Sequence, residues 1–330
     1  MARIAINGFG RIGRLALRAF AERKPADMEI VAINDLGDSD DNAHLFKYDS
    51  VHGTFPGDVT TTKESMNIGL GDMSLTSIPN PQELPWDKDR VDIVLECSGR
   101  FASRDGGNKH LQAGARKVLI SAPAGDVDAT VVYGVNHDTI DDSHKIVSNA
   151  SCTTNCLAPI ASVLHKSVGI ENGYMTTIHA YTADQRLVDT MHKDKRRMRA
   201  AALSMIPTST GAAKAVGLVL PELAGKLDGT AIRVPTPNVS MIDFTFTASR
   251  ATSVEEINHA VQTAAEGPMK GVIGIVTAPL VSIDFNHCPF SASFDATQTT
   301  VMDGTLCRVL AWYDNEWGFA NRMIDMLQVL

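Results

Sequence analysis

Two cysteines four positions apart stand in the stretch SNASCTTNC, which covers residues 148–156. Neither has a second pair of ligands at the spacing of a zinc site, and cysteines four apart on one helix seldom form a disulfide. Cys152 stands where a helix is expected to begin, and the unpaired amides and dipole of a helix N-terminus stabilise a thiolate. A cysteine taken alone is more often structural, but next to a nucleotide-binding domain and among polar residues we predict that Cys152 is a nucleophile. We also predict that Cys156 is a core residue on the apolar side of the helix and that the chain has no metal site.

A nucleophilic cysteine needs a base, and the chain has 10 histidines. His179 lies in GYMTTIHAYTADQ, a run of period two in which Thr177, His179 and Tyr181 share one face of an expected strand. A histidine in a strand is usually a hydrogen-bonded sheet residue. The residues alone therefore do not separate His179 from His137 or His287 as the base.

The composition is that of an ordinary soluble globular protein, with 44% hydrophobic and 21% charged residues among 330. This length suggests about two domains. No stretch reaches the ~18 apolar residues of a membrane helix, and the first residues lack the features of a signal peptide. Five cysteines, an odd number, favour a reducing compartment, so we predict the cytoplasm.

The charge of the chain limits its possible partners. A net charge of -8 disfavours a surface that binds nucleic acid. The basic run HKDKRRMR, residues 192–199, is a local exception. It is either a solvated or interface loop or a site for an anionic substrate.

The first residues follow the order strand, glycine turn, helix. RIAIN predicts a strand, Gly8-x-Gly10-x-x-Gly13 a tight turn, and RLALRAFAER a helix. In the dinucleotide fingerprint the first glycine permits the turn, the second lets a pyrophosphate approach the backbone, and the third lets helix and strand pack closely. A second strand ends in Asp35, about 20 residues further on, where the fingerprint has an acidic residue on the adenosine ribose. Asp35 favours NAD over NADP because a carboxylate repels a 2′-phosphate, although it could also cap the next helix.

Strands and helices continue to alternate through residue 149. Strands are expected at 91–99, 116–124, 130–136 and 144–149, with a helix at 103–115. This alternation predicts a Rossmann-type, doubly wound parallel sheet. The second half contains runs of period two (SMIDFTFTA, LVSIDF, LCRVLAWY), which predict an α+β domain with a mostly antiparallel sheet and helices on one face.

Several blocks of the chain, taken in order, resemble the glyceraldehyde-3-phosphate dehydrogenase family in its phosphorylating, bacterial glycolytic type. They are INGFGRIGR, SNASCTTNCLAP, HAYTADQR, IPTSTGAAKAVG, RVPTPNVS and WYDNEWGFANRM, and the likeness extends through nearly all 330 residues. It implies an NAD-binding domain of residues 1–151 and 316–330, since the final helix packs back on this domain in the family. Residues 152–315 would form the catalytic domain, and His179 would be the base.

The reaction implied by this resemblance oxidises glyceraldehyde 3-phosphate with NAD and inorganic phosphate to 1,3-bisphosphoglycerate and NADH. Cys152 would attack the aldehyde to form a thiohemiacetal, which hydride transfer converts into a thioester that phosphate then attacks. His179 would hold the thiolate and take the hydroxyl proton, and the backbone amide at Cys152 would donate to the oxyanion.

The resemblance also assigns binding residues. The substrate phosphate would meet Thr182 and Arg233, with Asp184 orienting the arginine. The attacking phosphate would be held by Ser151, Thr153, Arg197, Thr210 and Gly211. The cofactor would be held by the three glycines together with Arg11, Ile12, Asp35, Ser121 and Asn315.

Three positions depart from the family's pattern. Pro79 replaces an arginine often found near the adenine, Thr190-Met191 replaces a Leu-Pro pair, and Phe319 replaces a tyrosine. Because the first two touch the adenosine end of the site, some use of NADP is kept as an alternative.

Two other functions compete with this prediction. Erythrose-4-phosphate dehydrogenase is a sister enzyme that ends in hydrolysis, and it usually departs where this chain has Thr182 and TGAAKA. A nucleic-acid-binding protein on the same fold is disfavoured by the acidic charge. Family members are usually homotetramers with the segment 181–203 at a subunit contact, and we expect no membrane partner.

Overall fold

The computed structural model describes all residues from Met1 to Leu330, and the chain divides into two compact units. One unit contains residues 1–131, 137–151 and 320–330, and the other contains 132–136 and 152–319. The chain leaves the first unit between Ser151 and Cys152. The final helix, α7 (Trp317–Val329), carries it back, and the first unit takes it up at Ala320 rather than at Glu316.

The first unit is built on a sheet whose strands run in the order β10-β11-β9-β8-β1-β2-β7-β6-β5. All pairs from β10 to β7 are parallel, and β6 and β5 extend the edge with antiparallel pairs. The strands are β1 (Ala2–Asn7), β2 (Met28–Asn34), β5 (Thr60–Thr61), β6 (Ser65–Asn67), β7 (Asp72–Thr76), β8 (Ile93–Glu96), β9 (Lys117–Ile120), β10 (Ala129–Thr130) and β11 (Ile146–Ser148). A separate small pair is formed by β3 (Tyr48–Asp49) and β4 (Gly53–Thr54). The predicted doubly wound parallel sheet is confirmed.

The glycine turn that joins β1 to α1 (Arg11–Arg23) leaves no room for a side chain at two of its glycines. Gly8 has φ +92°, and a Cβ there would lie 2.5 Å from Cα of Ser98. A Cβ on Gly13 would overlap the carbonyl oxygen of Gly8, so α1 packs on the turn at the closest possible distance. Gly10, the N-cap of α1, has open space where a Cβ would stand.

A chain of buried polar groups holds the end of β8 against this turn. Glu96 is 1% exposed, and its carboxylate accepts from Asn7 Nδ2 at 2.5 Å, from Ser98 N at 2.8 Å and from His110 Nε2 at 2.9 Å. Trp86 Nε1 donates to His110 Nδ1 at 3.0 Å, so the imidazole proton must be on Nε2. Buried carboxylates are stable only when they are hydrogen-bonded in this way. His110 is carried by α3 (Arg104–Gln112).

The second unit contains a mixed sheet in the order β13-β14-β12-β15-β19-β17-β16, with β18 paired to β19. Most pairs are antiparallel, as predicted, but β12 pairs with β14 and β16 with β17 in parallel. The strands are β12 (Asn172–Ala180), β13 (Ile206–Ser209), β14 (Leu227–Val234), β15 (Ser240–Thr247), β16 (Ile273–Val276), β17 (Ala292–Asp295), β18 (Thr300–Met302) and β19 (Leu306–Tyr313).

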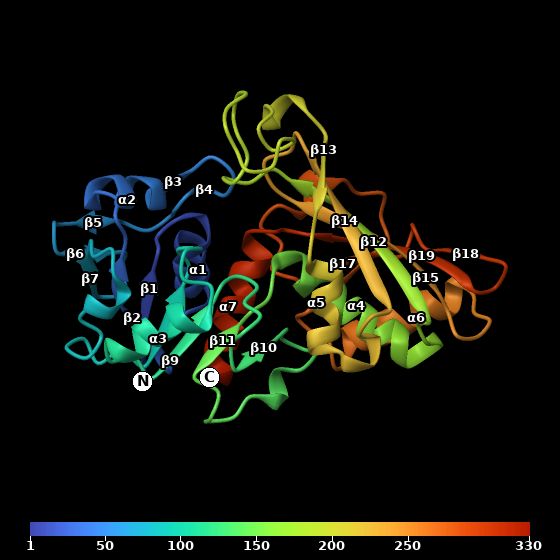
Figure 1. The fold of residues 1–330 in the computed structure, drawn as a ribbon, viewed down its shortest axis with the longest axis horizontal. Helices are drawn as coiled ribbons and strands as arrows, with labels where there is room; N and C mark the ends of the chain where they lie inside the picture. Colours follow the sequence, from blue (N-terminus) through green and yellow to red (C-terminus); the bar gives the residue numbers. More distant parts are fainter. The chain divides into compact units, whose positions relative to one another are not determined.

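The helices of the second unit cover one face of this sheet (Figure 1). They are α4 (Cys152–Val168), α5 (Ala212–Val219) and α6 (Val254–Glu266), and α4 packs on β15, β17 and β19. Along β12 the side chains of Met175, Thr177 and His179 are buried on one face, so the predicted alternation is confirmed. This alternation turns His179 inward.

The predicted strand at 130–136 is wrong beyond Thr130. Val131 N donates to the carbonyl oxygen of Ser148, next to the pairing of β10 with β11. The chain then turns: Val132 N donates to Asn136 Oδ1, and Gly134 has φ +85°. These residues belong to the second unit, where Gly134 packs near Met269 and Val272. Tertiary contacts therefore override the β-propensity of the valines.

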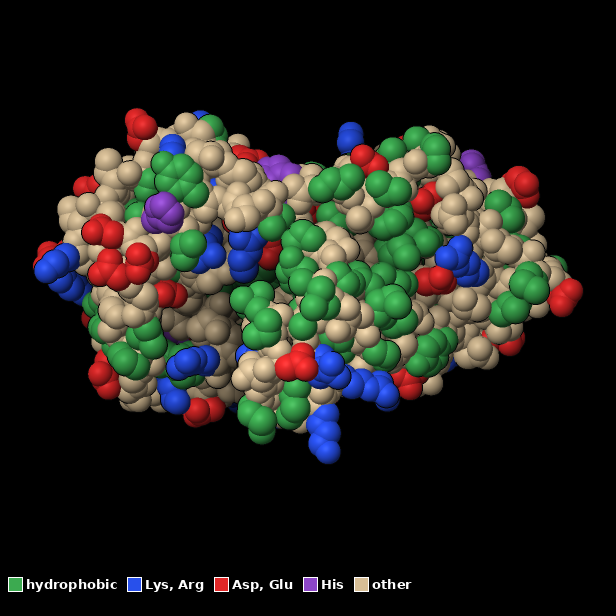
Figure 2. Space-filling model, turned by 90° about the horizontal axis from the view of Figure 1, so that it is seen from above, with side chains coloured by type: hydrophobic (Ala, Val, Ile, Leu, Met, Phe, Trp, Pro, Cys, Tyr) green, Lys and Arg blue, Asp and Glu red, His purple; other side chains and the backbone are tan.

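The surface of the second unit includes large apolar side chains. Figure 2 shows the face that carries the loop between β12 and β13, and hydrophobic side chains gather into a patch there. The most exposed large apolar side chains in or next to this loop are Leu187, Val188, Met191, Leu203 and Met205. None of the helices has the length and apolar character required to cross a membrane.

The close approach of α1 to the glycine turn can be tested by mutation. Gly13→Ala should lower the free energy of unfolding by about 2 kcal/mol or more, because the new methyl group forces α1 away from Gly8. Gly10→Ala is the matched control, since its Cβ meets no atom within 4 Å and its φ of -69° suits alanine. Urea unfolding of both variants measures the difference, and equal stabilities would contradict the close packing.

Candidate active site

Cys152 is placed by a strained turn between β11 and α4. Ala150 has φ +54°, in the left-handed region that costs a residue with a side chain about 1 kcal/mol or more. Its N–H donates to Ser148 Oγ at 3.1 Å, which holds the turn. Cys152 is then the first residue of α4 and is partly exposed, whereas Cys156 is fully buried.

His179 faces this cysteine from the end of β12. Its Nε2 lies 3.6 Å from Cys152 Sγ, and the histidine is only 4% exposed. None of the other histidines contacts Cys152 in a hydrogen bond or ion pair. The structure thus brings together the two residues predicted as nucleophile and base.

A third residue, Arg233 of β14, completes the cluster on the other side of the imidazole. Arg233 and His179 are register neighbours on the parallel strands β14 and β12. Arg233 Nη1 lies 2.6 Å from His179 Nδ1 and donates to the carbonyl oxygen of Ala180 at 2.9 Å. Burial and the positive charge of Arg233 lower the pKa of His179 to about 3. The imidazole is therefore neutral near pH 7, as a proton acceptor must be.

The Cys152 thiol differs from the expectation of a low pKa at a helix N-terminus. Burial raises the pKa of the thiol, although the charge of Arg233 and hydrogen bonds at Thr153 act in the opposite direction. Desolvation exceeds the effect of the helix terminus here. The thiol consequently needs a contacting base to ionise, and His179 is in contact with it.

A chain of buried hydroxyl groups lies behind the pair, and sequence reasoning missed its central residue, Tyr313. The Tyr313 hydroxyl lies 2.9 Å from both Thr153 Oγ1 and Thr177 Oγ1, and Thr177 donates to the carbonyl oxygen of Met241. Tyr313 therefore donates to Thr177, and Thr153 donates to Tyr313. The ring of Tyr313 also meets that of His179 edge-on, with centroids 6.0 Å apart. Only the position of Tyr313 within the block WYDNEWGFANRM could have indicated it.

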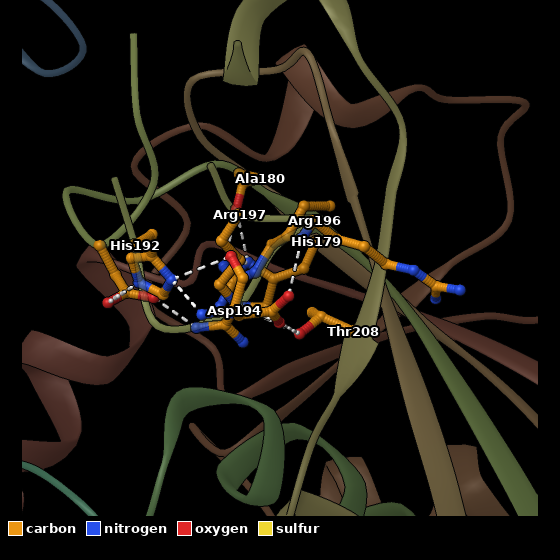
Figure 3. A network of polar contacts seen from close by, with 9 residues as sticks. His179, Ala180, His192, Asp194, Arg196, Arg197 and Thr208 are labelled. Atoms are coloured by element: carbon orange, nitrogen blue, oxygen red, sulfur yellow. Dashed lines mark hydrogen bonds and ion pairs between the residues drawn. The ribbon is translucent and has the colours of Figure 1, made fainter. Parts of the chain in front are cut away.

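Arg197 is held by acidic residues of its own loop. It forms an ion pair with Asp184, and its Nε donates to Thr208 Oγ1 at 3.1 Å. His192 Nδ1 accepts from Asp194 N at 2.9 Å, so its Nε2 carries the proton toward Asp184 Oδ1 at 3.3 Å. Figure 3 shows this network beside His179.

This network corrects one expectation and compensates part of the charge of the basic run. Asp184 was expected to orient Arg233, but it pairs with Arg197, because the loop folds Arg197 back onto it. Within the basic run, Arg199 pairs with Asp189 at 2.7 Å, and Arg196 points away from the cluster (Figure 3). The loop's own carboxylates thus compensate much of the charge of the run.

Three further residues were predicted to bind phosphate: Thr182, Thr210 and Gly211. None of them forms a hydrogen bond with Cys152, His179 or Arg233. Thr210 Oγ1 accepts from Ala212 N at 3.1 Å at the start of α5, and Gly211 is the N-cap. The carbonyl oxygen of Thr182 accepts from Gln185 N within the loop. Ser151 directly precedes Cys152.

The first unit fits a dinucleotide. Gly8, Gly10 and Asp35 line one pocket of about 250 Å³ together with Pro79. The N-terminus of α1 has no side-chain cap, and the open space at Gly10 lets a ligand approach its amides. Asp35 Oδ2 accepts from Phe9 N at 2.7 Å and Oδ1 from Gly37 N at 2.8 Å, which fixes the carboxylate at the edge of this pocket.

The other predicted cofactor residues are not among those that line the pocket, although Ser121 forms a hydrogen bond with Cys97, which does line it. The Arg11 side chain forms an ion pair with Asp49 at 2.5 Å, and Ile12 follows it in α1. Ser121 directly follows β9. Asn315, in the second unit, accepts from Ser240 Oγ at 2.7 Å through Oδ1, so its NH2 group is the end available to a ligand.

Comparison with known proteins decides the family. Residues 151–315 match the family model described as "Glyceraldehyde 3-phosphate dehydrogenase, C-terminal domain", and residues 2–104 match the one described as "Glyceraldehyde 3-phosphate dehydrogenase, NAD binding domain". The chain belongs to the glyceraldehyde 3-phosphate dehydrogenase family. This confirms the family predicted from the sequence blocks.

Curated members of the family resemble the chain over nearly its full length. Glyceraldehyde-3-phosphate dehydrogenase of Xanthobacter flavus is 64% identical over 98% of this chain and 96% of its own. The protein of that name from Pseudomonas aeruginosa is 61% identical over 98% of this chain and 96% of its own. Glyceraldehyde-3-phosphate dehydrogenase 1 of Bacillus cereus is 52% identical over 99% of this chain and 97% of its own. The glyceraldehyde 3-phosphate dehydrogenase family consists of NAD-dependent oxidoreductases, and NAD is the cofactor of this chain.

The low pKa of His179 predicts how stability depends on pH. Unfolded histidine binds a proton below pH 6.5, whereas folded His179 binds one only near pH 3. Between these values the unfolded state binds more protons, so stability from neutral His179 is lost as the pH falls through this window. For each unit by which the pH falls in this window, the free energy of unfolding of the wild type should decrease by up to about 1.4 kcal/mol more than that of His179→Asn.

The control for this measurement is His259→Asn, on the exposed side of α6. Urea unfolding between pH 7 and pH 4 should give this variant the same slope as the wild type. Parallel curves for His179→Asn and the wild type would contradict the buried, neutral state of His179.

Proposed function

We propose that this protein oxidises glyceraldehyde 3-phosphate with NAD and inorganic phosphate to 1,3-bisphosphoglycerate and NADH. The observation that carries the proposal is the contact of 3.6 Å between Cys152 Sγ and His179 Nε2, beside Arg233, in a chain of this family. Cysteine next to a base is the arrangement of an activated nucleophile. The family and the names of the relatives support this function and not the two alternatives.

The first half of the proposed reaction belongs to Cys152 and His179. Cys152 gives its proton to His179 Nε2, and the sulfur attacks the aldehyde carbon. The imidazolium then returns this proton to the oxygen, which completes the thiohemiacetal and leaves His179 neutral. The backbone amide of Cys152, at the start of α4, would donate to the oxygen. NAD, when bound, supplies the hydride acceptor. His179 takes the hydroxyl proton as the carbon is oxidised to a thioester.

In the second half, an oxygen of inorganic phosphate attacks the thioester carbon, and the Cys152 thiolate leaves. Two cations support this step and substrate binding. Arg233 is assigned to the substrate phosphate together with Thr182, and Arg197 to inorganic phosphate together with Ser151, Thr153, Thr210 and Gly211. Arginine suits both roles because its N–H groups hold phosphate oxygens in pairs.

The protein is further proposed to act as a homotetramer in the cytoplasm. Exposed apolar side chains in the loop between β12 and β13, among them Val188 at 71% and Leu203 at 85% exposed, support a subunit contact. Hydrophobic side chains also gather on this face in Figure 2. All five cysteines are free thiols, which suits a reducing compartment.

Phosphate dependence tests the proposed function. NADH formation from glyceraldehyde 3-phosphate and NAD should continue over many turnovers only when inorganic phosphate, or arsenate in its place, is present. Cys152→Ser should abolish turnover, and His179→Asn should lower kcat by ~10²–10⁴. Cys156→Ala, one helical turn from the nucleophile, is the matched control and should keep phosphate-dependent turnover.

Turnover that is indifferent to phosphate would overturn this proposal. It would mean that water resolves the thioester, which is the behaviour of the erythrose-4-phosphate enzyme.

The fixed carboxylate of Asp35 predicts a preference for NAD. Asp35→Ser should lower the ratio of kcat/KM for NAD to that for NADP by about tenfold or more, because the charge that repels a 2′-phosphate is removed. Asp38→Ser is the control, since Asp38 caps α2 (Ser39–Lys47) and serine can also cap. A wild-type enzyme that uses both cofactors equally well would contradict the role of Asp35.

A further inference from the structure

A row of buried polar side chains crosses the sheet of the first unit at the carboxyl ends of its strands. Asn7 ends β1 and pairs in register with Asn34 at the end of β2 and with Glu96 at the end of β8. Asn7 and Asn34 line the pocket of about 250 Å³ beside Asp35, the nucleotide pocket, whereas Glu96 does not line it. The reaction proposed for Cys152 and His179 leaves this buried carboxylate without a task.

The direction of the hydrogen bonds in this row is set by the backbone of Ile78. Ile78 N donates to Asn34 Oδ1 at 2.9 Å, and Asn34 Nδ2 donates to the carbonyl oxygen of Ile78 at 3.0 Å. Because a backbone N–H can only donate and a carbonyl oxygen can only accept, the Asn34 amide has one orientation. Asn34 Nδ2 also donates to Asn7 Oδ1 at 2.8 Å, so Asn7 Nδ2 faces Glu96.

A second chain of hydrogen bonds reaches the same carboxylate from α3. Trp86 Nε1 can only donate to His110 Nδ1, so His110 Nε2–H donates to Glu96 Oε2. The other oxygen, Oε1, accepts from Ser98 N at 2.8 Å, and the Ser98 hydroxyl contacts it as well. With the amide of Asn7, three groups that can only donate point at Glu96. The position therefore requires a side chain that only accepts.

We propose that Glu96 is a positioning residue for the cofactor, which fixes two walls of the nucleotide pocket at once. It holds Ser98 directly. On the other side it holds Asn7, and Asn34 passes this orientation on to Ile78. Ser98 and Ile78 both line the pocket. A site that already has its bound shape binds more tightly, because less order has to be gained on binding. The inference concerns NAD binding and does not depend on what resolves the thioester.

The charge of Glu96 by itself would act against the cofactor. Burial and the charge of Glu96 raise the pKa of the Cys97 thiol to about 12, although a hydrogen bond with Ser121 acts in the opposite direction. The charge is thus felt at Cys97, which lines the pocket. A carboxylate there repels the pyrophosphate of a dinucleotide. If Glu96 acted through its charge, its neutralisation would strengthen NAD binding, whereas loss of positioning weakens it.

Glu96→Gln tests the proposal, because it removes the charge and keeps the size of the side chain. Whichever way the new amide turns, its NH2 group faces a donor: Ser98 N on one side, or Asn7 Nδ2 and His110 Nε2 on the other. Isothermal titration calorimetry of the whole enzyme should show Kd values for NAD and for ADP-ribose about tenfold or more above those of the wild type. KM for NAD should rise with them, and kcat at saturating NAD should not fall. Glu64→Gln, at an exposed position of the same unit, is the control and should bind both ligands as the wild type does.

Asn7→Asp has opposite expected effects in two backgrounds. In the wild type it places two carboxylates in contact and should weaken NAD binding. In Glu96→Gln it gives the new amide an acceptor at residue 7, so the amide oxygen turns back to Ser98 N. The double variant should then bind NAD more tightly than Glu96→Gln alone, by about threefold or more.

Two variants of His110 keep the test independent of the folding of Glu96→Gln, since residue 110 does not line the pocket. His110→Leu removes a donor to Glu96 and leaves Trp86 Nε1 unpaired, and it should raise Kd for NAD by about threefold or more. His110→Gln can still donate to Glu96 and accept from Trp86, so its Kd should stay within about twofold of the wild-type value.

Unchanged or tighter NAD binding by folded Glu96→Gln would overturn the inference. Equal weakening by Asn7→Asp in both backgrounds would do so too, as would a His110→Leu enzyme that binds NAD as well as His110→Gln does. Failure of the proposed function is a separate result, since it appears as NADH formation that is indifferent to phosphate, whatever the affinity for NAD.

Discussion

The contact between Cys152 and His179 constrains everything else in the site, because His179 is buried and Cys152 is only partly exposed to water. Burial raises the pKa of the thiol and lowers that of the imidazole, so it favours the uncharged pair from both sides. An ion pair forms in such a place only when its two members are in contact and their other atoms are hydrogen-bonded. The remaining parts of the unit can be understood as the means of meeting this condition.

The turn before α4 and the strand β12 bring Cys152 and His179 together, and β19 connects these two elements by hydrogen bonds. The strained turn at Ala150 starts α4 with Cys152, and the alternation of β12 turns His179 inward. Tyr313 of β19 joins Thr153, the residue after the nucleophile, to Thr177, two residues before the base on the same face of β12. The geometry of the pair is therefore set by hydrogen bonds of residues that lie one position from Cys152 and two positions from His179.

Much of the fold could be predicted because its signals are local. The glycine spacing from Gly8 to Gly13 and the strand that ends at Asp35 specify their own backbone, and the structure has both. The residues after Thr130 were mispredicted because valines near Gly134 pack in the second unit, and no local pattern contains that information.

The sequence indicated residues that lie close together in the structure, but not how they pair. Family blocks indicated Cys152, His179, Arg197 and Arg233, yet the sequence could not show that Asp184 pairs with Arg197. It also could not show the raised pKa of the thiol, because a helix N-terminus is visible in a sequence whereas desolvation depends on what packs around it. Tyr313 carries no signal that separates it from other strand residues.

The two arginines of the site differ in what an anion would have to displace. Although burial acts in the opposite direction, hydrogen bonds from Arg197 and His192 lower the pKa of Asp184, so this carboxylate is charged when it holds Arg197. A phosphate at Arg197 therefore replaces one anion by another and gains only the difference. At Arg233 a phosphate replaces neutral acceptors and gains a full charge interaction. Arg233 is accordingly suited to hold the phosphate that anchors the substrate through both halves of the reaction. Arg197 is suited to a phosphate that must leave again as part of the product.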